Sequence, residues 1–230
     1  KRNRLLDQWP GVIVTIPRTV VLGADIFDEF MEDNNLYKIA LSDLSDEEIL
    51  DHFIAARLPF RLHEDLYTFI TVVNKPIAVR SSSMLEDSYY QPFAGIYSTY
   101  MVPNFVNDER MTIENLSNAI KSVYASAFFR DSKSYMTATS NVIDEEKMAI
   151  VLQEVTGTQY GERFYPTLSG VARSINFYPI DPEKPEDGIA NIALGLGKYI
   201  VDGGLTLRFS PRYPKKVLQL STPEFALRET

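Results

Sequence analysis

The sequence predicts an α+β protein in which helices dominate the first 145 residues and strands dominate the remainder. Two observations support this division. Before residue 145, apolar residues recur at spacings of three and four, which is the pattern of a helix with one buried face. After it, short apolar or alternating runs are separated by turn-rich segments, which is typical of strands. We therefore expect a helix-rich lobe at residues 1–143, a sheet-rich lobe at residues 144–230 and a ligand-binding cleft between the two lobes.

The first part of the chain opens with a predicted strand, followed by a series of helices. The strand covers Gly11–Pro17, and a short helix is predicted at Ala24–Met31. Ser45 and Glu48 have the spacing of a capping box, in which the serine oxygen accepts from a free backbone N–H and the glutamate reaches back. A helix is therefore predicted to begin there. Pro59 is expected to end it, and a second helix follows.

The later elements show the same two patterns. The longest helix is predicted to start at Thr112, because the apolar residues after it repeat at helical spacing: Ile113, Leu116, Ile120, Val123 and Ala127. Strands are predicted in five runs: Ile96–Val102, Lys147–Val155, Gly170–Ile180, Ile189–Leu194 and Leu205–Phe209. The segment Pro179–Gly188 is rich in proline and charge, which predicts a loop.

Composition excludes several classes of function. The 230-residue chain carries 23 basic and 31 acidic side chains, a formal net charge of −8. Such a surface repels nucleic acids and anionic membranes, so neither is an expected partner. Cysteine is absent, which excludes disulfides, thiolate catalysis and cysteine metal sites and agrees with a cytoplasmic location.

The segment between Lys75 and Gly95 is the most informative part of the chain. The apolar run Pro76–Val79 predicts a buried strand, and Arg80 and three serines follow it in what we expect to be a loop. Arginine offers forked, permanently charged donors to phosphate oxygens, and serine-rich turns add neutral donors. These residues suit a phosphate-bearing ligand. The alternative is a surface arginine beside a polar loop, and local chemistry alone does not choose between the two.

The segment VRSSSMLED at residues 79–87, with FAG at residues 93–95, resembles the VRSSATAED…SFAG signature of a known family. That signature belongs to the nucleotide-binding domain of phosphoenolpyruvate synthase and pyruvate phosphate dikinase, which has an ATP-grasp-like fold. Other passages resemble the family in the same order, at residues 14–36, 119–129, 151–155, 169–171 and 194–197. The resemblance therefore extends over residues 12–210.

The resemblance implies an ATP-binding domain that works with Mg²⁺, and it implies roles for individual residues. Arg80 would contact the transferred phosphoryl group, with Ser81 and Ser82 beside it. The strand Gln153-Glu154-Val155 would contact adenine through backbone groups. The alternative for Arg80 is a structural ion pair with Glu86 or Asp87. For Gln153-Glu154-Val155 the local sequence alone favours an ordinary strand end with solvated polar residues, and only the resemblance implies contact with adenine.

The glycine-rich segment after Leu194 departs from the family pattern. The family has a metal-binding glutamate where this chain has Lys198, and a glutamine where it has Asp202. An ammonium group in place of a carboxylate removes a hard oxygen ligand for magnesium. We expect Lys198 to neutralise phosphate instead, and Asp202 to supply the metal ligand. The alternative is that the glycines in this segment only permit tight turns.

Two parts of the family's catalytic apparatus are not found in the sequence. A glycine-lysine phosphate loop would precede Lys1, and the phosphate-carrying histidine of the family lies on a separate swivelling domain. We expect this chain to be a piece of a longer protein and to be inactive by itself. His52 and His63 lie on amphipathic helical segments without a catalytic arrangement, so both are interpreted as structural.

Three functions remain open. In the first, the chain is the ATP-binding domain of a phosphoenolpyruvate synthase-like phosphotransferase, which phosphorylates a histidine on the swivelling domain and acts on pyruvate or phosphoenolpyruvate. In the second, it is a non-catalytic module for nucleotide sensing or docking that derives from the same fold. The third, a purely structural interaction domain, is the least favoured because it leaves Arg80 and its serines unexplained.

Overall fold

The computed structural model describes residues 10–83, 97–105, 107–138, 147–197, 200, 206–217 and 220. The chain divides into two compact units, residues 1–155 (unit 1) and residues 156–230 (unit 2). Unit 1 combines helices with a sheet, and the described part of unit 2 is mainly sheet and loop. The mixed content fits the α+β class predicted from the sequence.

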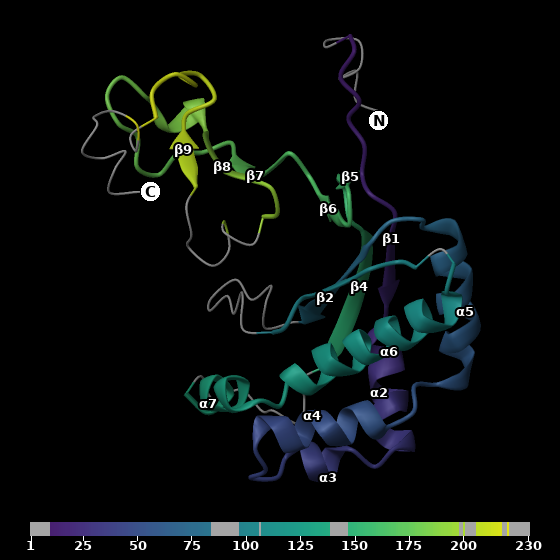
Figure 1. Cartoon of the computed structure of the whole chain (residues 1–230). Helices are drawn as coiled ribbons and strands as arrows, with labels where there is room; N and C mark the ends of the chain where they lie inside the picture. Colours follow the sequence, from purple (N-terminus) through teal and green to yellow (C-terminus); the bar gives the residue numbers. More distant parts are fainter. Residues whose placement is uncertain are drawn as a thin grey trace. The chain divides into compact units, whose positions relative to one another are not determined.

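Unit 1 is built on a four-stranded antiparallel sheet with the strand order β1-β4-β2-β3 (Figure 1). Its strands are β1 (Thr19–Leu22), β2 (Ile77–Ser83), β3 (Tyr100–Val102) and β4 (Met148–Glu154). Strand β4 lies between β1 and β2 and pairs with both along its length. It therefore belongs to unit 1. The division after Val155 differs from the boundary near residue 143 that the sequence suggested, because sequence composition does not reveal this long-range pairing.

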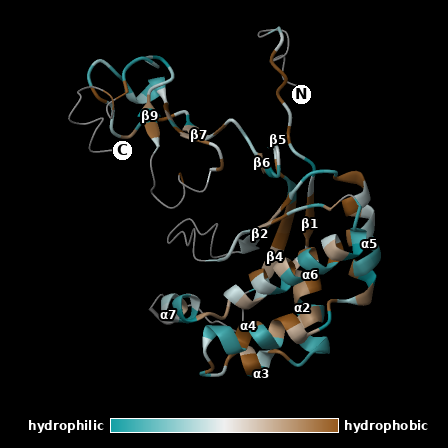
Figure 2. Cartoon of the chain, viewed as in Figure 1, coloured by the Kyte–Doolittle hydropathy of each residue, from teal (hydrophilic) through white to brown (hydrophobic). Residues whose placement is uncertain are grey.

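The described helices of unit 1 are α2 (Ala24–Asp33), α3 (Tyr37–Ala40), α4 (Asp46–Ala55), α5 (Phe60–Val72), α6 (Glu109–Ser126) and α7 (Arg130–Ala138). Helix α6 packs against β2, β3 and β4, and α2 packs against β4. In Figure 2 the strand β4 and the inward sides of α2 and α4 are coloured as hydrophobic. The centre of the core is a group of fully buried aromatic rings: Phe27, Phe30, Phe53, Tyr124 and Phe128.

Helix starts in unit 1 follow the predicted signals. The Ser45 Oγ accepts from the Glu48 N–H at 3.3 Å, and the Glu48 carboxylate accepts from the Ser45 N–H at 2.9 Å, so the capping box is confirmed. Pro59 stands directly before α5, where its missing N–H costs nothing. Helix α6 begins three residues earlier than predicted, because the Asp108 carboxylate accepts from the Met111 N–H at 2.9 Å and caps it.

The strand predicted at Gly11–Pro17 is wrong. The first strand is β1, and its pairing with β4 starts with Thr19 opposite Gln153. Residues 12–18 form no helix or strand. Pro17 lacks the N–H that a ladder needs, so regular pairing begins only beyond it.

Unit 2 contains two small sheets. A hairpin joins β5 (Thr158–Tyr160) to β6 (Arg163–Tyr165), and a three-stranded antiparallel sheet has the order β7-β8-β9. Its strands are β7 (Leu168–Arg173), β8 (Ile189–Leu194) and β9 (Leu207–Phe209), with the short 3₁₀ helix η2 (Pro185–Asp187) before β8. Across the described residues, no helix has the length and apolarity needed to span a bilayer.

The strand predicted at Gly170–Ile180 ends at Arg173, and its second half is a loop. The buried side chain of Asn176 stabilises this loop through hydrogen bonds. Its Nδ2 donates to the Glu183 carboxylate at 2.9 Å, and its Oδ1 accepts from the Tyr178 N–H at 3.1 Å. These local bonds compete with strand pairing for the backbone, which explains the early end of the strand. The loop predicted at Pro179–Gly188 is confirmed, with η2 inside it.

Candidate functional site

Arg80 lies in the middle of β2, on one face of the unit 1 sheet. It is opposite Val151 of β4, and it is exposed. Its neighbours Ile77 and Val79 are fully buried on the helix-covered face. Since successive side chains of a strand point to opposite faces, Arg80 projects from the other face. Its guanidinium has no hydrogen bond or ion pair to any residue within the described ranges.

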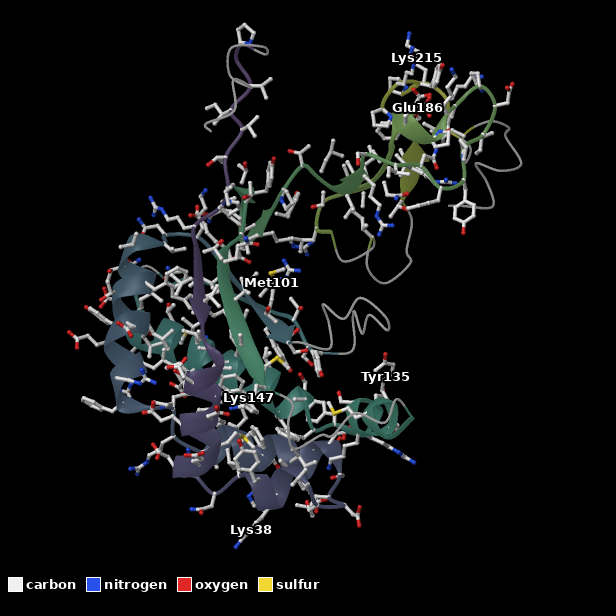
Figure 3. All side chains as sticks on the ribbon, turned by 180° about the vertical axis from the view of Figure 1, so that it is seen from behind. Lys38, Met101, Tyr135, Lys147, Glu186 and Lys215 are labelled. Carbon is white, nitrogen blue, oxygen red and sulfur yellow. The ribbon has the colours of Figure 1, made fainter. Side chains whose placement is uncertain are left out.

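We call the face that carries Arg80 the open face. By strand register and alternation it also carries Thr19, Val21, Ala78, Ser82, Met101, Ala149, Val151 and Gln153. The exposed fraction of Val21 is 59% and that of Met101 is 52%, and Figure 3 shows Met101 beside the strands from behind. The open face thus presents one arginine surrounded by aliphatic and small polar side chains.

The three serines after Arg80 are strand residues, so the predicted loop is wrong at this point. Ser81, Ser82 and Ser83 pair with Ile150, Ala149 and Met148 of β4. The ladder with β4 satisfies their backbone groups, and this outweighs the weak strand preference of serine. Only Ser82 shares the face of Arg80. Ser81 lies on the helix-covered face, and both Ser81 and Ser83 have interaction partners. Residues 93–95 of the signature lie outside the described residues.

The end of β4 holds the residues predicted to contact adenine. The Glu154 N–H donates to the Arg18 carbonyl at 2.9 Å, and the Val155 N–H donates to the Pro76 carbonyl at 2.8 Å. The Gln153 amide donates to the Thr19 hydroxyl at 3.0 Å. Both backbone donors are therefore occupied within the sheet. While these bonds are in place, neither N–H is available to adenine.

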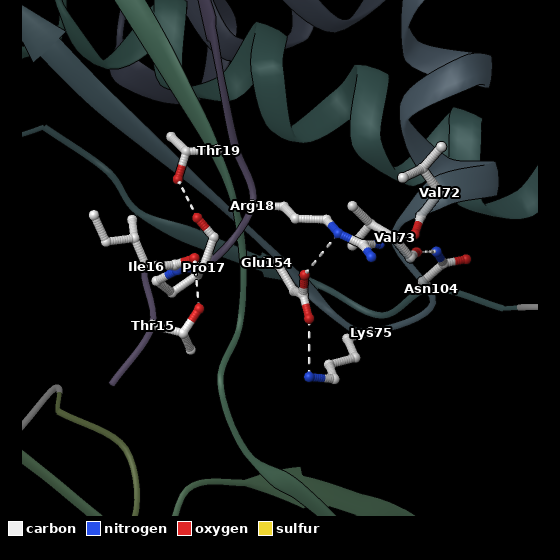
Figure 4. A network of polar contacts seen from close by, with 10 residues as sticks. All are labelled: Thr15, Ile16, Pro17, Arg18, Thr19, Val72, Val73, Lys75, Asn104 and Glu154. Carbon is white, nitrogen blue, oxygen red and sulfur yellow. Dashed lines mark hydrogen bonds and ion pairs between the residues drawn. The ribbon is translucent and has the colours of Figure 1, made fainter. Parts of the chain in front are cut away.

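Two basic residues that the sequence analysis did not identify surround Glu154 (Figure 4). Lys75 Nζ lies 2.9 Å from Glu154 Oε1, and Arg18 Nε lies 3.9 Å from Glu154 Oε2. The Glu154 side chain is only 15% exposed, whereas those of Arg18 and Lys75 are 60% and 44% exposed. Arg18 also donates to the Val72 carbonyl. One carboxylate thus ties the starts of β1 and β2 to the end of β4. Lys75 stands directly before the strand predicted at Pro76–Val79, which was the available signal, whereas Arg18 precedes β1, a strand that the sequence did not predict.

A second polar contact fixes the start of β4. Lys147, labelled in Figure 3, forms a hydrogen-bonded ion pair with Asp28 of α2. This contact raises the pKa of Lys147. Burial, followed by the charges of Asp28 and Glu32, raises the pKa of Tyr37 nearby. Both shifts favour the protonated forms, so Lys147 stays cationic and Tyr37 stays neutral across the neutral range. This cluster is structural support for β4.

In unit 2 the structure joins two sequence motifs that were identified separately. Ser169-Gly170-Val171 lies on β7, and Leu194–Gly197 ends β8 and continues into a turn. Leu168 is opposite Leu194, and the Ser169 hydroxyl donates to the Gly195 carbonyl at 2.6 Å. Lys198 and Asp202, which follow this turn in the sequence, lie outside the described residues.

The described residues offer no cluster of three or more carboxylate, histidine or cysteine groups that could hold a metal ion. The magnesium ligand predicted at Asp202 falls outside those residues, so it stays a prediction. His52 lies in the last turn of α4 and His63 on α5. Neither imidazole forms a hydrogen bond or ion pair with another residue in the described ranges, and the structural role of both stays a prediction.

Comparisons with known proteins agree with the sequence signature. Residues 4–217 match the family described as "Pyruvate phosphate dikinase, AMP/ATP-binding domain". The chain is 27% identical over 194 residues, 83% of its length, to a protein of Bacillus subtilis named as an uncharacterized phosphotransferase, YvkC. It is 30% identical over 144 residues, 63% of its length, to a phosphoenolpyruvate synthase of Aeropyrum pernix. The matched regions span 20% and 15% of those two proteins.

Proposed function

This chain belongs to the family of pyruvate phosphate dikinase AMP/ATP-binding domains, and we propose that it binds ATP at the open face of unit 1, with Arg80 as the phosphate contact. The observation that carries the proposal is the position of Arg80. It is held by a central strand, it is exposed, and it has no partner among the described residues. A guanidinium that extends from a central strand, without a partner among the described residues, is well suited to forked binding of phosphate oxygens.

The surroundings of Arg80 support a bound nucleotide. Val151 and Val21 follow it across the neighbouring strands β4 and β1, and both lie on the open face. Ligand sites are usually lined by apolar side chains with a few convergent polar groups, and this face has that composition. Ser82, two residues along β2, adds a hydroxyl on the same face.

The chemistry proposed for Arg80 is binding and orientation. Phosphoryl transfer requires little covalent chemistry from the protein, and positioning and charge stabilisation account for most of the catalysis. Arg80 would hold the phosphate oxygens and stabilise negative charge on them during transfer. The described residues do not fit a magnesium site, and we derive no step through the metal. Lys198 would neutralise phosphate, and Asp202 remains the proposed metal ligand.

The finer features of the family are part of this proposal. They comprise an ATP-grasp-like arrangement of two lobes, a cytoplasmic location, transfer to a histidine on a swivelling domain, and pyruvate or phosphoenolpyruvate as the partner of the whole protein. The chain spans about a fifth of the length of the phosphotransferase that it resembles. The domains needed for transfer would therefore lie elsewhere in a longer protein.

A second candidate function is a nucleotide-sensing or docking module without turnover. The sequence feature that favours it is Lys198, because the family has a metal-binding glutamate at this position. Radiolabelled ATP separates the two candidates. In the whole protein, an enzyme transfers label to a histidine in an acid-labile linkage, and a sensing module binds ATP without labelling.

Calorimetric titration of the chain with magnesium–ATP tests the binding proposal. Hydrogen bonds to charged groups contribute about 1.5–3 kcal/mol, so Arg80→Ala should raise Kd about 10- to 150-fold. Arg110→Ala is the matched control, because Arg110 is an exposed arginine on α6 without an ion pair in the described ranges. Unchanged Kd for Arg80→Ala, or an equal loss in both variants, would contradict the proposal.

A further inference from the structure

We infer that the side chain of Gln153 recognises the 6-amino group of adenine, and that Thr19 is the residue that orients it. The inference rests on the proposed function and deepens it, because it places the base of the same bound ATP on the open face. It assigns base recognition to a side chain, whereas the resemblance implies backbone groups of the same strand. Thr19 acts only through Gln153, so it is a positioning residue.

The backbone at the end of β4 has no donor to offer to a base. The N–H groups of Glu154 and Val155 both donate to carbonyl oxygens of unit 1. Gln153 itself lies in the ladder between β1 and β2. Recognition of a purine edge requires a donor beside an acceptor, and the carboxamide of Gln153 supplies both groups.

Gln153 and Arg80 lie close enough for one nucleotide to reach both. Gln153 is opposite Ala78 of β2, and Arg80 is two residues further along the same strand and on the same face. Diagonal neighbours of this kind have Cα atoms about 7–8 Å apart. Met101, opposite Ala78 on the other side, is 52% exposed. Its thioether is a suitable apolar contact for an aromatic ring on this row.

Two hydrogen bonds in series fix the orientation of the Gln153 amide. The Thr19 hydroxyl donates its single proton to the Pro17 carbonyl at 3.0 Å, a contact drawn in Figure 4. The Thr19 oxygen can therefore only accept, and it accepts from Gln153 Nε2 at 3.0 Å. A rotated amide would place Oε1 against an oxygen that has no proton left to donate. The amide nitrogen thus stays directed toward β1.

This orientation leaves Gln153 with one donor and one acceptor for a ligand. Within the described residues, Oε1 accepts no hydrogen bond and Nε2 donates only to Thr19. Adenine presents its 6-amino donor beside an acceptor nitrogen, which is the complementary pair for a glutamine amide. Hypoxanthine has a carbonyl at position 6, so its oxygen would face Oε1 with no proton between them. The site should therefore prefer ATP to inosine triphosphate.

Calorimetric titration of the chain with the magnesium complexes of ATP and inosine triphosphate tests the inference. The unmodified chain should bind ATP about 5- to 150-fold more tightly. Gln153→Leu removes both amide groups and keeps a side chain of similar size, so the ratio of the two Kd values should fall to about 1–2. Gln159→Leu is the matched control, because the Gln159 amide on β5 donates to the Gly161 carbonyl, and it should leave the ratio unchanged.

Two substitutions of similar size test the positioning role of Thr19. Thr19→Val removes the oxygen and lets the amide turn, so discrimination between the two nucleotides should fall about 2- to 10-fold. Thr19→Ser keeps the hydroxyl and should keep the discrimination of the unmodified chain. A threonine that only stabilised β1 would change the affinity for both nucleotides equally. An unchanged ratio in Thr19→Val would therefore overturn its positioning role.

Arg80→Ala separates this inference from the proposed function. Under that function Arg80 contacts phosphate in both nucleotides, so its loss should weaken both equally and preserve their ratio. Binding that depends on Arg80 but does not distinguish the two bases, or a ratio unchanged by Gln153→Leu, would overturn the inference and leave the proposed function standing. Absence of binding for both nucleotides would overturn the two together.

Discussion

Unit 1 and unit 2 are stabilised by different kinds of interaction. Unit 1 buries a continuous hydrophobic core, with the rings of Phe27 and Tyr124 in edge contact at 5.1 Å between centroids. Among the described residues of unit 2, the buried hydrophobic side chains are only those of Ala190 and Ala193. The small apolar area means that burial contributes much less to the stability of unit 2 than to that of unit 1.

Unit 2 is ordered instead by polar contacts around loops and turns. Its buried polar side chains include Asn176 and Ser210, and Asn176 joins a network with Glu183 and Arg208. Large apolar side chains remain at the surface, among them Phe177 at 70% and Tyr178 at 79% exposed. The comparison teaches that the two units should respond differently to the same kind of substitution.

The largest expected effect is the loss of an aromatic ring from the unit 1 core. Phe53 is fully buried against Phe30 and Phe128, so Phe53→Ala should lower the free energy of unfolding by about 3–5 kcal/mol. Phe177→Ala, the matched substitution in unit 2, should change it by less than about 0.5 kcal/mol. Urea titration followed by circular dichroism measures both. Similar losses in the two variants would show that the comparison is wrong.

The next largest effect is expected at the polar centre of unit 2. Asn176→Ala removes three side-chain hydrogen bonds and leaves the Tyr178 N–H without its acceptor. It should therefore lower the free energy of unfolding by about 1–3 kcal/mol. Hydrogen exchange should accelerate across residues 176–187 and stay unchanged in α6 of unit 1. An exchange pattern that spreads equally over both units would mean that they unfold together.

A smaller effect, of opposite sign, is expected in unit 1. The Tyr124 hydroxyl is buried and has no hydrogen-bond partner in the part of the chain that the structure describes. Burial is also the main cause of its raised pKa, with a further contribution from Asp25. Tyr124→Phe removes this unsatisfied group and keeps the ring, so it should raise stability by about 1 kcal/mol. A measured loss of stability would reveal a partner for the hydroxyl.

The smallest effect concerns pH and the capping box of α4. Hydrogen bonds from the Ser45 backbone and side chain lower the pKa of Glu48 below its ordinary value. A lowered folded-state pKa contributes stability that is present above the unfolded-state pKa and is lost as pH falls through the folded-state pKa. The stability difference between the unmodified chain and Glu48→Gln should therefore shrink on acidification from pH 6 to below the folded-state pKa of Glu48. A difference that grows over this range would contradict the assignment.

Sequence reasoning succeeded where the determinants are local. The Ser45–Glu48 box lies at the start of α4 and Pro59 stands directly before α5, so spacing alone located both helix starts. It failed where the outcome depends on a distant partner. The serines after Arg80 are strand residues because β4, almost 70 positions later, pairs with them.

The candidate site shows the same limit. Arg80 was found from its signature, and the structure adds that it stands on an exposed sheet face without a described partner. The Glu154 contacts with Arg18 and Lys75 join residues far apart in the sequence, and no local pattern pairs them. Likewise, no local pattern predicted the hydrogen bond from the Ser169 hydroxyl to the Gly195 carbonyl, although the motifs at residues 169–171 and 194–197 had each been identified.

The most direct test of the central claim compares ATP with adenosine, which lacks the phosphates, as ligands for Arg80→Ala in calorimetric titrations. If Arg80 binds phosphate, the variant should lose about 10- to 150-fold in affinity for magnesium–ATP and keep the adenosine affinity of the unmodified chain. Equal losses for both ligands, or no loss for either, would contradict the claim.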